Sequence, residues 1–253
     1  RLAVIADPVY TADDPRIRTA INRSPLPPRI LQVADVALTR SARDQLSLQR
    51  LPSTGVEARE IVNLINDPSE TLVLIGAEAN RARVMTAHLD QYRILHFATH
   101  AMADSEDPAL ATLALSRWDL AGNPVEGSLR LYDITQMRLN ADLVVLSGCD
   151  TSLGREIAGE GPIGLSQAFL RAGARSVIST LWQVPDTSTA LLMREFYHQL
   201  LSKEVDAAAA LQLAQDHIRR QLKWSDPYYW AGFQLISKAR IEPDNNDIEN
   251  RRE

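Results

Sequence analysis

The chain has 253 residues, of which 45% are hydrophobic, and its formal net charge is −5. This length suits one large α/β domain or two small ones, and the acidic balance argues against a broad nucleic-acid-binding surface. The apolar runs in the sequence fall short of the roughly 18 residues that a membrane-spanning helix needs. The first residue is Arg1, and we interpret the chain as a piece of a longer protein.

The sequence contains a single cysteine, Cys149. One cysteine excludes an intrachain disulfide framework and a structural zinc site built on cysteines. It is typical of a protein from a reducing compartment. We therefore expect a cytoplasmic protein.

Short apolar runs predict buried strands, and stretches with helical spacing predict helices between them. The predicted strands, in chain order, are Leu2–Ala6, Thr71–Ile75, Arg93–Ala98, Leu110–Leu115, Leu143–Ser147, Ser176–Leu181 and Phe233–Ile236. The predicted helices span residues 56–65, 79–89, 162–172, 187–201 and 205–222. Pro162 suits the first turn of its helix, and Gly173 suits the position just after the helix ends.

Strands that alternate with helices predict an α/β fold with a mainly parallel sheet covered by helices on both faces. Residues 9–50 are rich in proline and arginine, and we expect irregular structure there, packed against the edge of the sheet. We expect one domain over residues 1–240, followed by a polar, frayed tail over residues 241–253.

Two of the predicted strands end on reactive side chains, His100 and Cys149. The carboxyl ends of neighbouring parallel strands meet at one edge of a sheet, which is where sheets of this kind carry their chemistry. If the two strands are neighbours, the spacing predicts a Cys–His pair in which the imidazole activates the thiol. The alternative is that both are packing residues, as most lone buried cysteines are.

Four blocks of this sequence closely resemble the CHAT domain family, a group of caspase-like proteins related to caspases, separase and gingipains. The blocks are YRILHFATHA, ADLVVLSGCDTSLG, GEGPIGLSQAFLRAGARSVISTLWQVPD and PYYWAGFQLI. The resemblance implies a caspase-like three-layer sandwich and a catalytic dyad of His100 and Cys149. It also implies that the backbone N–H groups at Ala101 and Cys149 bind the oxyanion, and that no metal or cofactor takes part.

The sequence departs from the family pattern at two places. Ala101 stands where family members usually have glycine, and a glycine with positive φ would not accept a methyl group without strain. The triplet Gly148-Cys149-Asp150 differs from the commoner Ala-Cys-Glu, which we expect to be a conservative change.

Several residues are candidates for the pocket that would bind the substrate side chain before the cleaved bond. By resemblance, Trp182 and Asp186 border this pocket, and Asp186 would favour a basic side chain. The competing interpretation, which we favour, is that Asp186 begins a helix, where an acidic residue is favourable in any case. Asp150 and Glu160 are further candidates, and each could equally be a solvated loop charge.

Two other groups of residues have a structural interpretation. His96 lies four residues before His100, too far along a strand for both to bind one metal ion, so we expect it to support the site or the core. The aromatic residues 228–230 come just before the last strand, and we expect them to belong to the core.

The sequence thus predicts a bacterial cysteine endopeptidase that acts on a protein or peptide substrate. By resemblance, it would be regulated by a partner protein or a fused helical-repeat domain, in a system of antiviral defence or cell death, without binding nucleic acid or membrane itself. Residues 150–160 could form a gate over the site. Two alternatives stay open: a catalytically weak caspase-like scaffold, suggested by Ala101, and another thiol-dependent acyl transfer.

Overall fold

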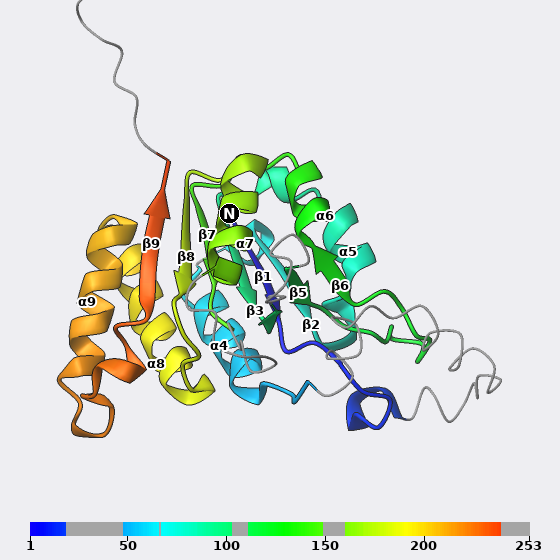
Figure 1. The fold of residues 1–253 in the computed structure, drawn as a ribbon, viewed down its shortest axis with the longest axis horizontal. Coiled ribbons are helices and arrows are strands. Elements are labelled where there is room, and N and C mark those ends of the chain that lie inside the picture. Colours follow the sequence, from blue (N-terminus) through cyan, green and yellow to red (C-terminus); the bar gives the residue numbers. More distant parts are fainter. Residues whose placement is uncertain (19–47, 66, 103–110, 149–159, 239–253) are drawn as a thin grey trace, which may run out of the picture.

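The computed structural model describes residues 1–18, 48–65, 67–102, 111–148 and 160–238 (Figure 1). Of residues 160–163 it describes only the helical backbone. Within these ranges no helix is long and apolar enough to cross a membrane.

The centre of the molecule is a six-stranded sheet with the strand order β2-β1-β3-β7-β8-β9. The first five strands in this order run parallel, and β9 pairs antiparallel with β8 at one edge. The strand bounds are β1 Leu2–Ala6, β2 Thr71–Ile75, β3 Ile94–Ala98, β7 Leu143–Leu146, β8 Ser176–Thr180 and β9 Phe233–Ser237. The mainly parallel sheet confirms the predicted α/β fold.

Helices cover both faces of this sheet, which gives three layers (Figure 1). One face packs against α4, α8 and α9, and the other packs against α5, α6 and α7. The helices are α4 Pro52–Val62, α5 Arg81–Thr86, α6 Leu131–Gln136, α7 Glu160–Ala172, α8 Asp186–Tyr197 and α9 Ala207–Arg219. Burial on both sides explains why the strands are apolar at consecutive positions rather than at alternate ones.

Alternate residues of each strand enter different cores. In β1, Ala3 and Ile5 join the core under α5 and α7, whereas Val4 joins the core under α4, α8 and α9. The residues of strand β3 alternate between the two faces in the same way. One of them, His96, is polar and fully buried on the face that α4 and α8 cover. The sheet therefore carries an ionisable group inside an otherwise apolar layer.

A second, smaller sheet lies beyond the carboxyl end of β3. It consists of β4 Ala101–Met102, β5 Thr112–Ala114 and β6 Ser128–Arg130, all antiparallel. The strand predicted over residues 110–115 is present as β5, which pairs with β4 and β6 rather than with the main sheet. Burial on both sides gives a short run the same composition in either sheet, so periodicity does not distinguish the two.

The predicted helices are present, but their ends differ from the prediction. Helix α4 begins four residues earlier than expected, because Pro52 occupies its first turn. Helix α5 ends at Thr86, since His88 adopts the left-handed conformation with φ 49° and redirects the chain. Gly173, with φ 124°, follows α7 as expected. Helix α6 was not predicted, because six residues carry little periodicity.

Short helical turns complete the connections. They are the 3₁₀ turns Pro68–Glu70, Gly76–Glu78, Leu89–Gln91, Leu222–Trp224 and Pro227–Tyr229, and a π-helical turn His198–Ser202 that extends α8.

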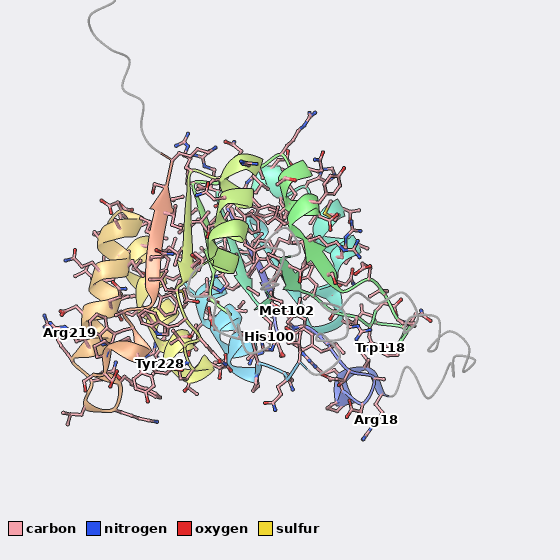
Figure 2. All side chains as sticks on the ribbon, in the orientation of Figure 1. Arg18, His100, Met102, Trp118, Arg219 and Tyr228 are labelled. Atoms are coloured by element: carbon pink, nitrogen blue, oxygen red, sulfur yellow. The ribbon has the colours of Figure 1, made fainter. Side chains whose placement is uncertain are left out.

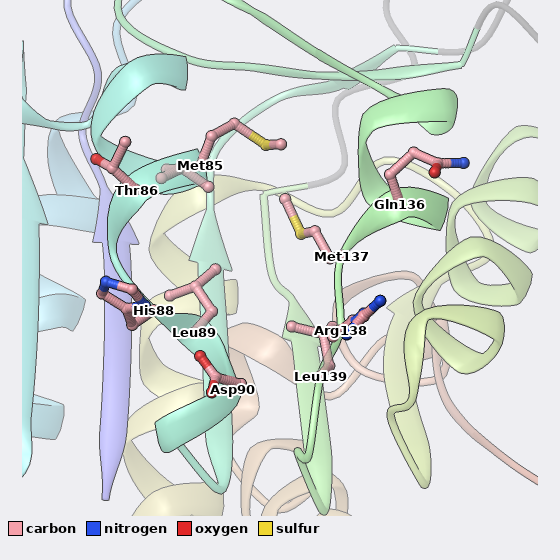
Figure 3. Close-up of a pocket in the computed structure, with 10 residues that line it drawn as sticks. Met85, Thr86, His88, Leu89, Asp90, Gln136, Met137, Arg138 and Leu139 are labelled. Atoms are coloured by element: carbon pink, nitrogen blue, oxygen red, sulfur yellow. The ribbon is translucent and has the colours of Figure 1, made fainter.

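A cavity of about 570 Å³ opens at the amino edge of the sheet, where the chain enters β3 and β7 (Figure 3). Leu89 and Asp90 precede β3, Met137 and Leu139 precede β7, and Met85 comes from α5. This cavity lies at the opposite ends of β3 and β7 from the edge at which the predicted chemistry falls.

Candidate active site

The predicted site depends on β3 and β7 being neighbours, and in the structure they pair directly. Ile94 pairs with Leu143 and Phe97 with Leu146, in parallel register. The Ser147 N–H extends this ladder by donating to the Phe97 carbonyl at 3.1 Å. The carboxyl ends of the two strands therefore lie side by side.

Gly148, the last described residue before Cys149, packs directly on the backbone of Thr99. A Cβ atom added at Gly148 would lie 2.5 Å from the Thr99 carbonyl oxygen and 2.6 Å from its amide nitrogen. No side chain fits in that space, so alanine is not equivalent to glycine here and the expected conservative change was misjudged. The close approach brings the end of β7 against the residue that precedes His100.

His100 lies at this carboxyl edge and is almost fully buried, with 1% of its surface exposed (Figure 2). Its Nε2 lies 2.7 Å from the carbonyl oxygen of Gln49. A carbonyl only accepts hydrogen bonds, so Nε2 must carry the proton. In the neutral ring the lone pair is then on Nδ1, which fixes the tautomer that His100 presents to its surroundings.

The Gln49 carbonyl belongs to residues 48–51, a segment that we call the strap because it crosses His100. Leu48 anchors one end in a small apolar cluster with Tyr10, Met102 and Ala114. The Leu51 carbonyl anchors the other end by accepting a hydrogen bond from Thr54 Oγ1 at 2.7 Å. The strap thus leads into α4 and holds its carbonyl against the imidazole.

Tyr10 supports the same histidine from another side. Its ring centroid lies 5.3 Å from that of His100, and its hydroxyl lies 2.8 Å from Thr99 Oγ1. Burial raises the pKa of Tyr10 well above its usual value, so the hydroxyl stays neutral. Thr99 Oγ1 in turn donates to the Ala114 carbonyl, which ties the end of β3 to the small sheet.

Ala101, the predicted oxyanion donor, begins β4 and is buried. It is not among the described residues with positive φ, so its methyl group causes none of the strain that we expected. The Ala114 N–H donates to the His100 carbonyl at 2.9 Å, which makes Ala101 and Leu113 a non-hydrogen-bonded pair of the ladder. The Ala101 N–H therefore points away from β5.

Asp186 is the first residue of α8, which agrees with the structural interpretation of this residue. Its carboxylate also accepts a hydrogen bond of 3.0 Å from the backbone N–H of Ser53 in the first turn of α4. Burial raises the pKa of Asp186, the Ser53 hydrogen bonds oppose this rise, and the nearby charges of Glu57 and His100 act in opposite directions. Asp186 therefore ties two helices together beside His100.

Trp182 follows β8 at the same edge of the sheet. Its indole N–H donates to the Tyr228 carbonyl at 2.9 Å, and its ring lies where a Cβ on Gly232 would have to be. Tyr228 is 47% exposed, so it lies outside the core, whereas the half-buried Trp230 packs against the core under α8 and α9 as expected.

A buried polar cluster lies between the sheet and α4 and α8. Its centre is His96, whose Nε2 lies 2.8 Å from the carboxylate of Glu57 and 3.2 Å from Ser147 Oγ. Its Nδ1 lies 3.0 Å from the Tyr197 hydroxyl. Burial raises the pKa of Tyr197 well above its usual value, and the nearby Glu57 adds to the rise. The cluster confirms that His96 has a supporting position, and it links β3 to β7 two residues before Cys149.

Several predicted site residues lie outside the described part of the chain. Cys149 and Asp150 are among them, as are most of the residues 150–160 that we proposed as a gate, and the side chain of Glu160 is not described. Within the described residues, no group of three or more His, Cys, Asp or Glu side chains could hold a metal ion.

Sequence reasoning missed the residues that surround His100. Tyr10 and Gln49 contact His100 directly, Asp7 and Arg50 pair next to Gln49, and Glu57 lies against His96. The aspartate at the end of the first strand was the one available signal, because polar residues that follow buried strands gather at the carboxyl edge. Gln49 contacts His100 through its backbone carbonyl. Every residue has such a carbonyl, so the residue type at position 49 gives no signal of this contact.

Comparison with known proteins agrees with this architecture. The family model of the CHAT domain matches residues 3–238. Tetratricopeptide repeat protein 28 from Mus musculus is 30% identical over 221 residues, and its Homo sapiens counterpart is 30% identical over 215 residues. Each match covers 74% of this chain but only 8% of the relative. With an α/β, caspase-like fold and a family match over nearly its whole length, the chain belongs to the CHAT domain family.

Proposed function

We propose that this chain is a cysteine endopeptidase whose catalytic dyad is His100 and Cys149. The observation that carries the proposal is the setting of His100. The Gln49 carbonyl holds Nε2 in its protonated form, which leaves the lone pair on Nδ1, and Gly148 packs against Thr99 immediately before the cysteine. Family membership adds support, because CHAT domains belong to a caspase-like group of peptidases.

The reaction follows from the roles of these groups. His100 Nδ1 takes the proton of the Cys149 thiol, and the thiolate attacks the carbonyl carbon of the scissile peptide bond. The N–H groups of Ala101 and Cys149 stabilise the oxyanion that forms. His100 donates a proton to the leaving amine, and the C–N bond breaks to give an acyl-enzyme. Water then hydrolyses the thioester with His100 as general base, which releases the acid and regenerates the thiol.

The substrate would be a protein or peptide, because CHAT domains belong to a caspase-like group of peptidases. We extend the proposal to regulation by a partner protein or a fused helical-repeat domain, and to a bacterial system of defence or cell death in the cytoplasm. Both relatives are named tetratricopeptide repeat protein 28, which fits the association with helical repeats.

A second candidate is a caspase-like scaffold with little catalysis. The observation in its favour is that only 1% of the His100 surface is exposed, because the strap and Tyr10 cover the ring. A covered histidine suits a binding module, or a peptidase held closed.

The test is the rate at which iodoacetamide alkylates Cys149 as a function of pH, followed by intact mass. The single cysteine makes the assignment unambiguous. We expect the wild-type chain to react at about pH 6–7 and His100→Ala to require a pH above about 8, because the imidazole lowers the thiol pKa. His217→Ala is the matched control, since His217 is exposed on α9.

Equal, ordinary thiol profiles for wild type and His100→Ala would contradict the dyad and favour the scaffold. If the dyad is confirmed, a peptide library compared between wild type and Cys149→Ala identifies the cleaved bond. Hydrolysis of small esters without cleavage of any peptide would instead support another thiol-dependent acyl transfer.

A further inference from the structure

The strap touches His100 through a backbone carbonyl, so something must hold that carbonyl in place. The residue after Gln49 is Arg50, and its guanidinium makes a two-point contact with the carboxylate of Asp7. Arg50 Nε donates to Asp7 Oδ1 at 2.8 Å and Arg50 Nη2 donates to Oδ2 at 2.7 Å. A planar fork of this kind fixes orientation as well as distance.

Asp7 is itself rigidly placed. It follows β1 directly, with φ 47°, and its own N–H donates to Thr54 Oγ1 at 3.1 Å. Its carbonyl accepts from the Gly76 N–H at 3.1 Å. Gly55 leaves room for the carboxylate, because a Cβ there would lie 3.0 Å from Asp7 Oδ2. The Asp7 carboxylate is a fixed point at the carboxyl edge, one strand away from His100.

A second cation shares this carboxylate. Arg16 Nη1 lies 3.0 Å from Asp7 Oδ2, and Arg16 also binds Asp14. Within the described residues Arg16 contacts Asp7, Pro8 and Asp14 rather than the strap, so its role is to neutralise Asp7 from the other side. Loss of Arg50 would therefore leave the buried Asp7 with a cation, which limits the damage to the fold.

We infer that Asp7 and Arg50 are positioning residues for the proposed peptidase, which act through the strap on the tautomer of His100. The chain of contacts runs from the end of β1 through the Asp7–Arg50 pair to the Gln49 carbonyl and then to His100 Nε2. This inference rests on the proposed function for its catalytic meaning. The tautomer itself is a structural property that can be measured without any catalysis.

The primary experiment is imidazole ¹⁵N NMR of the chain at about pH 8, above the usual histidine pKa of about 6.5. The His100 signals are those that disappear in His100→Ala. We expect the wild type to show one tautomer with the proton on Nε2. In Arg50→Ala we expect a mixture of both tautomers, and in Arg50→Lys a smaller shift, because lysine keeps the charge but loses the fork.

Arg81→Ala is the matched control. Arg81 forms the same two-point contact with Asp133, at 3.0 and 2.6 Å, but between α5 and α6. Its side chain is 34% exposed and that of Arg50 is 44% exposed, so the two substitutions remove similar groups. Arg81→Ala should leave the His100 signals unchanged. Circular dichroism confirms the fold, and Arg50→Lys replaces Arg50→Ala if the alanine variant does not fold.

The catalytic consequence is read from the alkylation of Cys149. At about pH 6.5 we expect Arg50→Ala to react roughly tenfold more slowly than wild type, with rates that converge above pH 8.5, where an ordinary thiol is ionised. A purely structural role would change the stability but not this pH dependence.

The outcomes separate the two proposals. If His100 in Arg50→Ala still shows a single Nε2–H tautomer, the positioning role is overturned. The same holds if alkylation of wild type depends on His100 and Arg50→Ala keeps the wild-type pH profile. If alkylation of wild type does not depend on His100, the proposed peptidase fails. The NMR comparison then still decides whether Asp7 and Arg50 set the tautomer.

Discussion

The two edges of the central sheet are held by different kinds of interaction. At the carboxyl edge, buried polar groups make short contacts: His100 with the Gln49 carbonyl, Tyr10 with Thr99, and Asp7 with two arginines. At the amino edge, Asp142 pairs with Arg93 and Arg175, and all three side chains are at least 41% exposed. The open cavity between Leu89 and Leu139 lies at the same edge (Figure 3).

The difference shows that the free-energy cost of burying polar groups falls at the carboxyl edge. Buried polar groups oppose folding unless every partner is in place, whereas exposed ion pairs change the stability little in either direction. Buried ionisable groups gathered at one edge agree with the proposed active site there. The following predictions test this contrast, from the largest expected effect to the smallest.

The buried pair of His96 and Glu57 should be the most sensitive point. Both side chains have 0% exposure, so His96→Leu leaves a buried carboxylate without the group that lies 2.8 Å from it. We expect the free energy of unfolding to fall by about 3–5 kcal/mol, measured by urea denaturation. The double variant His96→Leu/Glu57→Met should recover most of this loss, because it removes the charge as well. A double variant as unstable as the single one would contradict this account.

Gly148→Ala tests the contact that joins the ends of β3 and β7. The new Cβ would lie 2.5 Å from the Thr99 carbonyl, so the backbone must shift. We expect a loss of about 1–3 kcal/mol in the free energy of unfolding, typical of an overpacked site. An unchanged unfolding curve would mean that the two strand ends separate easily, and the argument for proximity would weaken.

Two aspartates should respond to pH in opposite directions. Burial raises the pKa of Asp186 in the folded state, so its contribution to stability is most favourable at acidic pH and declines as pH rises above the usual carboxyl range. Asp186→Asn does not titrate and still accepts from the Ser53 N–H. We therefore expect Asp186→Asn to become more stable relative to wild type as pH rises from about 4 to 7. The measurement is the thermal unfolding temperature of both proteins at each pH.

Asp133 is the counterpart at the other side of the sheet. The hydrogen bonds from Arg81 lower the pKa of Asp133, so its stabilising contribution is present at neutral pH and is lost as pH falls through the lowered value. Asp133→Asn should therefore be less stable than wild type at pH 7, with the difference vanishing in acid. The same pH slope for both variants would show that burial and pairing do not distinguish the two sites.

The amino edge should tolerate change. Arg175→Ala removes an ion pair of 3.1 Å whose arginine is 71% exposed, and Asp142 keeps its contact with Arg93. We expect a change of about 0–1 kcal/mol in the free energy of unfolding, and less at high salt. A larger loss of unfolding free energy would mean that this exposed ion pair is needed for stability. The two edges would then not differ in the way described.

The sequence predicted much of the fold because each main strand is an apolar run with distinct flanking signals. Strands β1 and β2 have the predicted bounds, and α7 ends before Gly173 as expected. The sequence did not reveal which sheet β5 joins, because a short buried run could fit either, and it missed α6, which is too short to show a period. The helix ends at Pro52 and Thr86 depended on local backbone angles, which periodicity does not report.

For the candidate site, the sequence by itself determined which residue types stand at the ends of β3 and β7. It contained the four blocks that resemble the CHAT domain family. It also determined that a glycine precedes Cys149. Only the tertiary structure decided that β3 and β7 are neighbours, that a backbone carbonyl of Gln49 meets His100, and that Asp7 and Arg50 hold it there. Strand order and carbonyl positions arise from how distant segments pack, and the pattern of side chains along one segment carries no record of that packing.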